Sequence, residues 1–168
     1  MEMKNSTWLL GSNSESGFHS LYGGFCRDEG GFLRVIKGGP GTGKSSFMRR
    51  VAAEAESRGL AVERIICSGD PASLDAVYIP ELRLGYADGT SPHVLDPEVF
   101  GADGDYLNIG ECCDARQASH LDSLGSLSAG YRGWYARAYE LLRAAAAVSP
   151  SVSRSYVTAQ DRAAAVQR

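Results

Sequence analysis

Residues 38–45 read Gly-Gly-Pro-Gly-Thr-Gly-Lys-Ser, and their types and spacing point directly to chemistry. The closely spaced glycines let a backbone curl so that successive N–H groups face one concavity, which accepts the oxygens of a phosphate. Lys44 supplies a mobile positive charge for the same anion, and the hydroxyl of Ser45 is a suitable oxygen ligand for Mg²⁺. These residues therefore predict a site for a phosphate-bearing ligand together with a divalent cation.

The same segment fits the pattern G-x-x-x-x-G-K-[ST], which is called the Walker A or P-loop motif. This motif needs a strand before it and a helix after it. The apolar run 32–36 predicts a buried strand, and residues 44–58 predict a helix that ends before Gly59 and points its N-terminal dipole at the anion. The residues predicted to bind the nucleotide are Gly38, Gly39, Pro40, Gly41, Thr42, Gly43, Lys44, Ser45 and Ser46.

Two acidic residues complete the predicted catalytic group. Asp88 ends the alternating run 82–88 and is the predicted second metal ligand beside Ser45, although an Asp-Gly dipeptide is also a common turn. Glu81 is predicted to orient the attacking water as a base. The predicted catalytic residues are thus Lys44, Asp88 and Glu81.

The order of elements around the motif indicates the fold class. A strand at 32–36, a glycine loop, a helix at 44–58 and a second strand at 61–67 form a βαβ unit, which implies a parallel sheet. We therefore predict an α/β, P-loop NTPase-like fold, with a mostly parallel sheet and flanking helices. Three strands are credible and a fourth is doubtful, where about five are usual in a sheet, so the sheet is predicted to be incomplete.

A long helical segment is predicted at about 114–148, because apolar residues recur there at spacings of three and four. Ser149-Pro150 is predicted to end this helix. The expected organisation is a P-loop nucleotide-binding domain over residues 1–148, followed by a helical or flexible tail over residues 149–168.

The composition excludes several classes of protein. Lys and Arg number 17 and Asp and Glu number 20, which gives a net charge of −3, and 43% of the 168 residues are hydrophobic. This balance is typical of a folded globular chain and argues against nucleic acid or an anionic membrane as the main partner. No apolar run approaches the roughly 18 residues of a membrane span, and the expected localisation is cytoplasmic.

The chain resembles a family of largely uncharacterised bacterial P-loop ATPases that are built as two tandem P-loop halves. The resemblance spans roughly residues 9–145. It is carried by the segments 17–22, 37–45, 73–77, 79–82, 88–97 and 107–111, of which Asp-Gly-Thr-Ser-Pro-His at 88–93 is the most distinctive. It implies binding and hydrolysis of ATP with Mg²⁺ and supports Asp88 as a metal ligand. A second Walker A motif is absent, so the chain corresponds to the N-terminal half, and a second half or a protein partner is expected to complete the sheet.

Three functions stay open at this point. The leading expectation is a Mg²⁺-dependent ATPase that acts through Lys44, Ser45 and Asp88. The second is a nucleotide or small-molecule kinase whose acceptor binds near Asp70, His93 and Asp96. The third is a nucleotide-sensing module without turnover, in which ATP orders loops and the long aromatic helix binds a partner.

Overall fold

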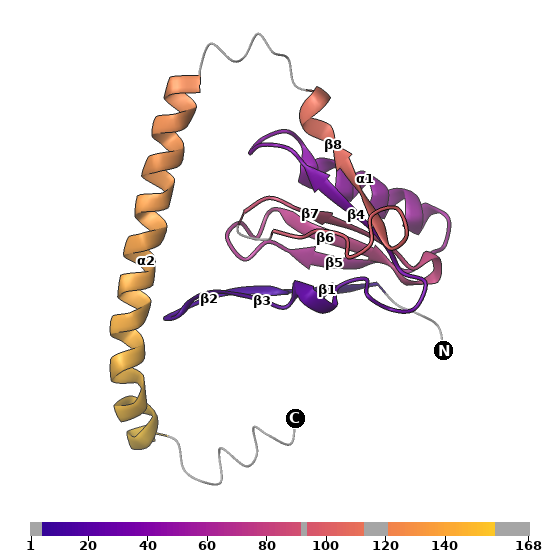
Figure 1. The fold of residues 1–168 in the computed structure, drawn as a ribbon. Helices are drawn as coiled ribbons and strands as arrows, with labels where there is room; N and C mark the ends of the chain where they lie inside the picture. Colours follow the sequence, from indigo (N-terminus) through magenta and orange to yellow (C-terminus); the bar gives the residue numbers. More distant parts are fainter. Residues whose placement is uncertain (1–4, 92–93, 113–120, 157–168) are drawn as a thin grey trace. The chain divides into compact units, whose positions relative to one another are not determined.

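The computed structural model describes residues 5–91, 94–112 and 121–156, with the side chains of the long helix described over 129–150. The described chain divides into two compact units. The first unit holds residues up to Ser12 and from Phe18 to Cys112, and it contains the main sheet (Figure 1). The second unit holds Asn13–Gly17 and the helix α2.

The main sheet has six strands in the order β1-β5-β6-β7-β4-β8. The pairs β1–β5, β4–β7 and β4–β8 are parallel, whereas β6 is antiparallel to both of its neighbours. The sheet is therefore mixed, and the prediction of a P-loop NTPase-like fold with a mostly parallel, incomplete sheet is wrong. The strands are β1 (Ser6–Trp8), β4 (Phe32–Lys37), β5 (Glu63–Ile66), β6 (Leu74–Ile79), β7 (Leu84–Asp88) and β8 (Gly104–Asn108).

Two short connections reverse the chain on either side of β6. Between β5 and β6 the N–H of Cys67 donates to the carbonyl of Ser73 at 3.1 Å, and the N–H of Ser73 donates to the carbonyl of Asp70 at 2.8 Å. Between β6 and β7 lies the 3-10 turn η2 (Pro80–Leu82), which ends at Arg83 with a positive φ of 49°. Neither link is long enough for the crossover that parallel neighbours require, so β6 runs antiparallel.

The sheet carries a separate hydrophobic layer on each face. The helix α1 (Lys44–Ser57) packs on one face, where Met48 and Ala52 are fully buried in a cluster with Ile36 and Val77. The other face is covered by the short 3-10 helix η1 (Tyr22–Gly24) and the residues that follow it. Each face of the sheet therefore has its own buried cluster, and the glycine loop lies where β4 ends and α1 begins.

Three smaller elements complete the description of the chain before α2. Strands β2 (Gly11–Ser14) and β3 (Gly17–Ser20) form a separate two-stranded sheet. The 3-10 helix η3 (Ile109–Cys112) follows β8 directly. These segments contribute few buried side chains, and the described core is formed mainly by the six-stranded sheet, α1 and the region around η1.

The helix α2 (Leu121–Tyr156) is 36 residues long and contains Pro150. The predicted end at Ser149-Pro150 is therefore wrong, and the predicted boundary between residues 148 and 149 falls within one helix. Its described side chains are mostly exposed, including Trp134 at 72%. Within this unit, the hydroxyl of Tyr139 donates to Asn13 Oδ1 at 2.6 Å. Of the described helices, none is both long and apolar enough to cross a membrane.

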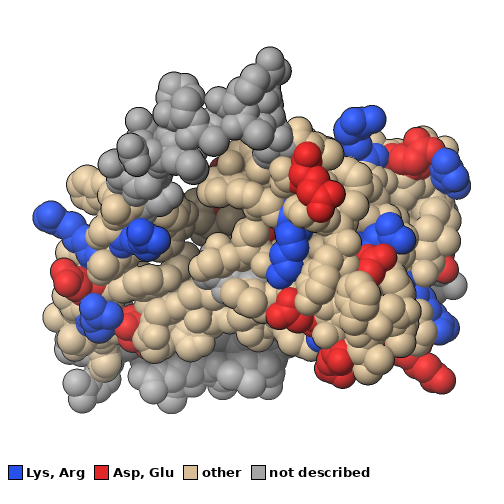
Figure 2. Space-filling model, turned by 45° about the horizontal axis from the view of Figure 1, so that its top comes forward, with Lys and Arg blue, Asp and Glu red and all other residues tan. Residues whose placement is uncertain are grey.

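The charged residues are mixed on the face shown in Figure 2. Acidic and basic side chains alternate over this face and do not gather into a large area of one sign. Elsewhere among the described residues, charged side chains form pairs, such as Arg58 with Glu54 at 2.6 Å and Arg64 with Glu56 at 2.8 Å. A surface of this kind produces little net field to attract a polyanion.

Candidate functional site

The glycine loop, residues 38–43, joins the end of β4 to the start of α1. Gly41 and Gly43 have φ values of 78° and 92°, in the left-handed region that residues with a Cβ atom adopt only at a cost. The first N–H to bond within the helix is that of Phe47, which donates to the carbonyl of Gly43 at 2.8 Å. The amides of the preceding helical residues therefore lack helical acceptors and are available to an anion at the helix N-terminus.

Lys44 folds back over this loop. Its ammonium donates to the carbonyls of Gly38 at 2.7 Å and Gly39 at 2.9 Å. The same nitrogen lies 3.5 Å from Asp88 Oδ2, and the Lys44 side chain is only 9% exposed. The positive charge is thus held inside the curve of the loop by two neutral acceptors and one carboxylate.

Asp88 ends β7 and lies beside β4, where its register partner is Ile36. One carboxylate oxygen, Oδ1, accepts hydrogen bonds from the N–H of Thr90 at 2.9 Å and from its hydroxyl at 2.5 Å. The other, Oδ2, faces Lys44. The structure therefore brings Asp88 and Lys44 together, and Thr90 fixes the orientation of the carboxylate.

Ser45 lies in the first turn of α1, between that helix and the start of β6. Its hydroxyl oxygen accepts a hydrogen bond from the N–H of Leu74 at 2.9 Å and lies 3.5 Å from a guanidinium nitrogen of Arg49. Within the loop, the hydroxyl of Thr42 donates to the carbonyl of Gly39 at 2.8 Å. These bonds tie the loop and the helix start to neighbouring parts of the fold.

The oxygens at this site suit a Mg²⁺ ion that arrives with a phosphate ligand. Across residues 5–91, 94–112 and 121–156 no group of three or more His, Cys, Asp or Glu side chains could hold a metal ion by itself. Ser45 and Asp88 offer a hydroxyl and a carboxylate oxygen. Mg²⁺ commonly takes one or two protein oxygens and fills its remaining positions with phosphate oxygens and water, so the residues present fit the predicted ion.

Glu81 is not brought to the glycine loop, which corrects its predicted role as the water-orienting base. It lies in η2 before β7, whereas Asp88 ends that strand, so the length of β7, about 16 Å, separates the two positions. Its Oε1 accepts a hydrogen bond from the N–H of Ala61 at 3.0 Å. Glu81 therefore links the start of β5 to the β6–β7 turn.

The sequence analysis missed a buried polar cluster at the strand ends near the loop. Asp75 is 6% exposed, and Tyr22 Oη lies 3.5 Å from its Oδ2. Burial and, after it, the Asp75 charge raise the pKa of Tyr22, and burial chiefly raises the pKa of Cys67, with Asp75 adding to that effect. A β-bulge between Ile65 and Ile66 disturbs the pairing opposite Asp75. An acidic residue inside an otherwise apolar run was the available signal.

The residues expected near an acceptor substrate lie in different settings. Asp70 Oδ1 accepts a hydrogen bond from the N–H of Ala72 at 3.0 Å and so stabilises the turn between β5 and β6. Asp96 accepts hydrogen bonds from Tyr106 at 2.9 Å and from Lys37 at 3.4 Å. The Tyr106 hydrogen bond lowers the pKa of Asp96, with Lys37 contributing further. His93 lies outside the described residues.

No family model matches this chain, and no curated protein or solved structure matches it either. The resemblance to the tandem P-loop ATPases therefore stays a prediction. The geometry of the glycine loop, with the Lys44 ammonium folded onto two of its carbonyls and 3.5 Å from Asp88, is the observation from which a function can be argued.

Proposed function

We propose that this chain binds a nucleoside triphosphate, ATP being the expected one, together with Mg²⁺ at the glycine loop, and hydrolyses its terminal phosphate. The observation that carries the proposal is the position of Lys44. Its ammonium is nearly buried, folded onto two carbonyls of the loop and 3.5 Å from Asp88. This positive charge lies at a helix N-terminus, where two neutral carbonyls and one carboxylate hold it. The two carbonyls can be exchanged for phosphate oxygens, which form stronger charge-assisted hydrogen bonds.

Each residue has a role in this proposal that follows from its position. The amides at the start of α1 and in the loop donate to phosphate oxygens, and Lys44 neutralises charge on the outer phosphates. Ser45 and Asp88 would hold Mg²⁺, which supplies charge neutralisation at the phosphates when it is bound. The hydrogen bond from Thr90 would orient the Asp88 carboxylate for the ion, and the hydrogen bond from Leu74 would hold the Ser45 hydroxyl in place.

Hydrolysis breaks the bond between the terminal phosphorus and its bridging oxygen, which leaves as part of the nucleoside diphosphate. Water forms the new bond to the phosphorus, keeps one proton in the hydrogen phosphate product and releases the other to solvent. Glu81, the predicted base, lies at the far end of β7 from Asp88. Turnover therefore depends on positioning and charge stabilisation by the loop and Lys44, and we expect it to be slow. The same observation favours a second candidate, a nucleotide-sensing module that binds without turnover.

Binding is tested by titrating the full chain with ATP and Mg²⁺ and comparing Lys44→Ala with Arg50→Ala. Arg50 is an exposed residue of α1, so its removal matches the charge change without touching the loop. A hydrogen bond to a charged group contributes about 1.5–3 kcal/mol, so Lys44→Ala should weaken binding roughly ten- to hundredfold while Arg50→Ala leaves it unchanged. Equal affinity of Lys44→Ala and the wild-type chain would refute the proposed site.

Release of inorganic phosphate separates the two candidates. The ATPase proposal expects Mg²⁺-dependent release that falls in Asp88→Asn and disappears in Lys44→Ala. Saturable ATP binding with no release above the buffer rate would favour the sensing module. Release that persists unchanged in Lys44→Ala would come from another site or from a contaminant, and it would remove the support for hydrolysis at the loop.

A further inference from the structure

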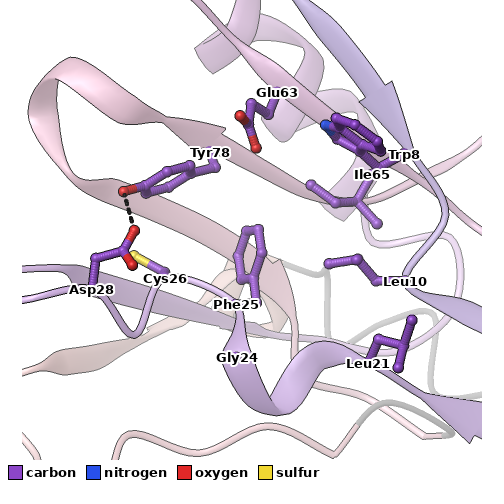
Figure 3. Close-up of a pocket in the computed structure, with 10 residues that line it drawn as sticks. All are labelled: Trp8, Leu10, Leu21, Gly24, Phe25, Cys26, Asp28, Glu63, Ile65 and Tyr78. Carbon is purple, nitrogen blue, oxygen red and sulfur yellow. Dashed lines mark hydrogen bonds between the residues drawn. The ribbon is translucent and has the colours of Figure 1, made fainter.

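A second hollow lies on the sheet face that η1 covers, and its lining differs in kind from that of the glycine loop. This pocket has a volume of about 420 Å³, within the range of small-molecule sites. Its walls include Trp8, Phe25, Ile65 and Tyr78 (Figure 3). The carboxylates of Asp28 and Glu63 also line the pocket and give it negative charge.

The pocket is separate from the glycine loop. Glu63 begins β5 and pairs with Tyr78 near the end of β6, whereas the start of β6 is the end that meets Ser45 through Leu74. The pocket residues from these two strands therefore lie toward the opposite ends of the strands from the loop. A ligand in the pocket would be a different molecule from the nucleotide.

The aromatic walls are partly fixed by packing. The rings of Phe25 and Tyr78 meet edge to face, with centroids 6.0 Å apart, and Phe25 is buried. Trp8 is 55% exposed, and its indole N–H donates to the hydroxyl of Ser6 at 2.8 Å. Figure 3 shows the Glu63 side chain between Tyr78 and Trp8 and across from Phe25. The pocket thus combines ring surfaces with a carboxylate among them.

The charge in the pocket is negative. The described residues that line it include two acids and no Lys or Arg. Tyr78 Oη lies 3.5 Å from Asp28 Oδ2. Nearby basic side chains have other partners: Arg64 pairs with Glu56 and Arg27 with Asp103. Within the described part of the chain, no ion pair is formed by Glu63, which sits half-buried beside the rings.

We propose that this pocket binds a small organic cation, a protonated amine on an aromatic or apolar body. The carboxylates of Glu63 and Asp28 attract the ammonium, and aromatic faces stabilise a cation through their ring quadrupoles. The apolar body gains by leaving water for the walls formed by Phe25 and Ile65. This inference does not depend on nucleotide binding, because it uses other residues at another place in the sheet.

The test is calorimetric titration of the full chain with three compounds of similar shape: phenethylamine, neutral 2-phenylethanol and anionic phenylacetate. We expect the amine to bind at least about tenfold tighter than the alcohol, since tenfold corresponds to the roughly 1.4 kcal/mol gained from one charged contact. Phenylacetate should not bind. Equal affinity of amine and alcohol, or no binding of the amine at millimolar concentration, would overturn the proposal.

Variants locate the site. Glu63→Gln keeps the size of the side chain and should weaken amine binding about tenfold, whereas Glu29→Gln, next to Asp28 but outside the lining, should leave it unchanged. Asp28→Asn is a second variant in case Glu63→Gln fails to fold. Equal binding by the wild-type chain, Glu63→Gln and Asp28→Asn would place the amine elsewhere and overturn the assignment.

A lysine side chain on a peptide carries the same ammonium and provides the second arm of the test. An unstructured peptide with a single lysine is titrated under the same conditions as phenethylamine. Weaker binding of the peptide supports a small ligand, because a volume of about 420 Å³ suits a small molecule. Tighter binding of the peptide would overturn the small-molecule assignment in favour of a protein partner.

Discussion

Tyr22 and Asp75 bury a phenol and a carboxylate at the strand ends beside the glycine loop. Burying polar groups costs free energy unless they are hydrogen-bonded, so the contact between the Tyr22 hydroxyl and the Asp75 carboxylate offsets part of the cost of burying them. Burial and the Asp75 charge both favour the neutral phenol, and both raise the pKa of Tyr22. Lys44 is a parallel case, since its nearly buried ammonium has three acceptors around it.

The raised pKa of Tyr22 predicts a loss of stability in alkali. A phenol ionises near pH 10 in the unfolded chain and only at higher pH in the folded one. The contribution of the Tyr22 phenol to the free energy of unfolding is complete below pH 10. It declines as the pH rises above that value, by up to about 1.4 kcal/mol per pH unit. The free energy of unfolding, measured in urea from pH 8 to 11, should therefore fall more steeply in the wild-type chain than in Tyr22→Phe.

The control for this prediction is Tyr131→Phe, which removes an exposed phenol from α2. Its alkaline slope should equal that of the wild-type chain. If Tyr22→Phe also kept the wild-type slope, the Tyr22 phenol would ionise alike in the folded and unfolded chains, and its close burial against Asp75 would be disproved.

At the scale of elements, the segment from β4 through α1 to β5 was predictable and the rest of the sheet was not. The apolar run 32–36, the glycines after it and the helix stop at Gly59 are local signals, and the strand, loop, helix and strand are found where they predict. The direction of β6 depends on the two short reversals around it. The first is the turn between β5 and β6, and the second is η2, which begins at Pro80.

The same reversal explains the error on Glu81. Glu81 follows β6 directly, so it would share the edge of Asp88 only if β6 ran parallel to β7. Because β6 runs antiparallel to β7, the end of β6, η2 and the start of β7 lie together at the opposite edge of the sheet from Asp88. The place of Asp88 at the end of β7 could be predicted, because an alternating run ends there next to a turn. The sheet edge at which Glu81 lies depends on the direction of β6, which is set by long-range pairing that the local pattern does not encode.

Glu81→Ala should therefore affect stability and leave the nucleotide site intact. The change removes the acceptor for the N–H of Ala61, a part-buried bond of 3.0 Å between the β6–β7 turn and the start of β5. Leaving such a donor unsatisfied costs about 1–3 kcal/mol, measurable as a lower unfolding midpoint in urea. The affinity for ATP should stay within experimental error of the wild-type value.

Glu81→Gln is the matched variant for this prediction, because its amide oxygen can still accept the bond. It should recover most of the stability that Glu81→Ala loses. A large fall in phosphate release for Glu81→Gln, with stability retained, would contradict the structural role and return Glu81 to the reaction.

At the scale of the whole molecule, the two units differ in what stabilises them. Both hydrophobic clusters, one on each face of the sheet, belong to the first unit. The helix α2 would extend about 54 Å at its 36 residues, and its described side chains are mostly exposed. It also contains Gly130, Gly133 and Pro150, each of which lowers the intrinsic stability of a helix. Burial therefore stabilises the first unit much more than α2.

This difference predicts two separate unfolding transitions, and the two tryptophans allow each to be followed. Trp8 lies in β1 of the first unit and Trp134 in α2, so Trp134→Phe leaves a reporter on the sheet and Trp8→Phe leaves one on the helix. Because poorly buried segments open at lower free energy, Trp134 fluorescence and part of the helical circular dichroism should change at lower urea concentration than Trp8 fluorescence. The sheet should then unfold in a later, cooperative step. Coincident curves from the two single-tryptophan variants would show that α2 unfolds together with the sheet, which requires that α2 draw its stability from burial against other parts of the protein or against a second chain.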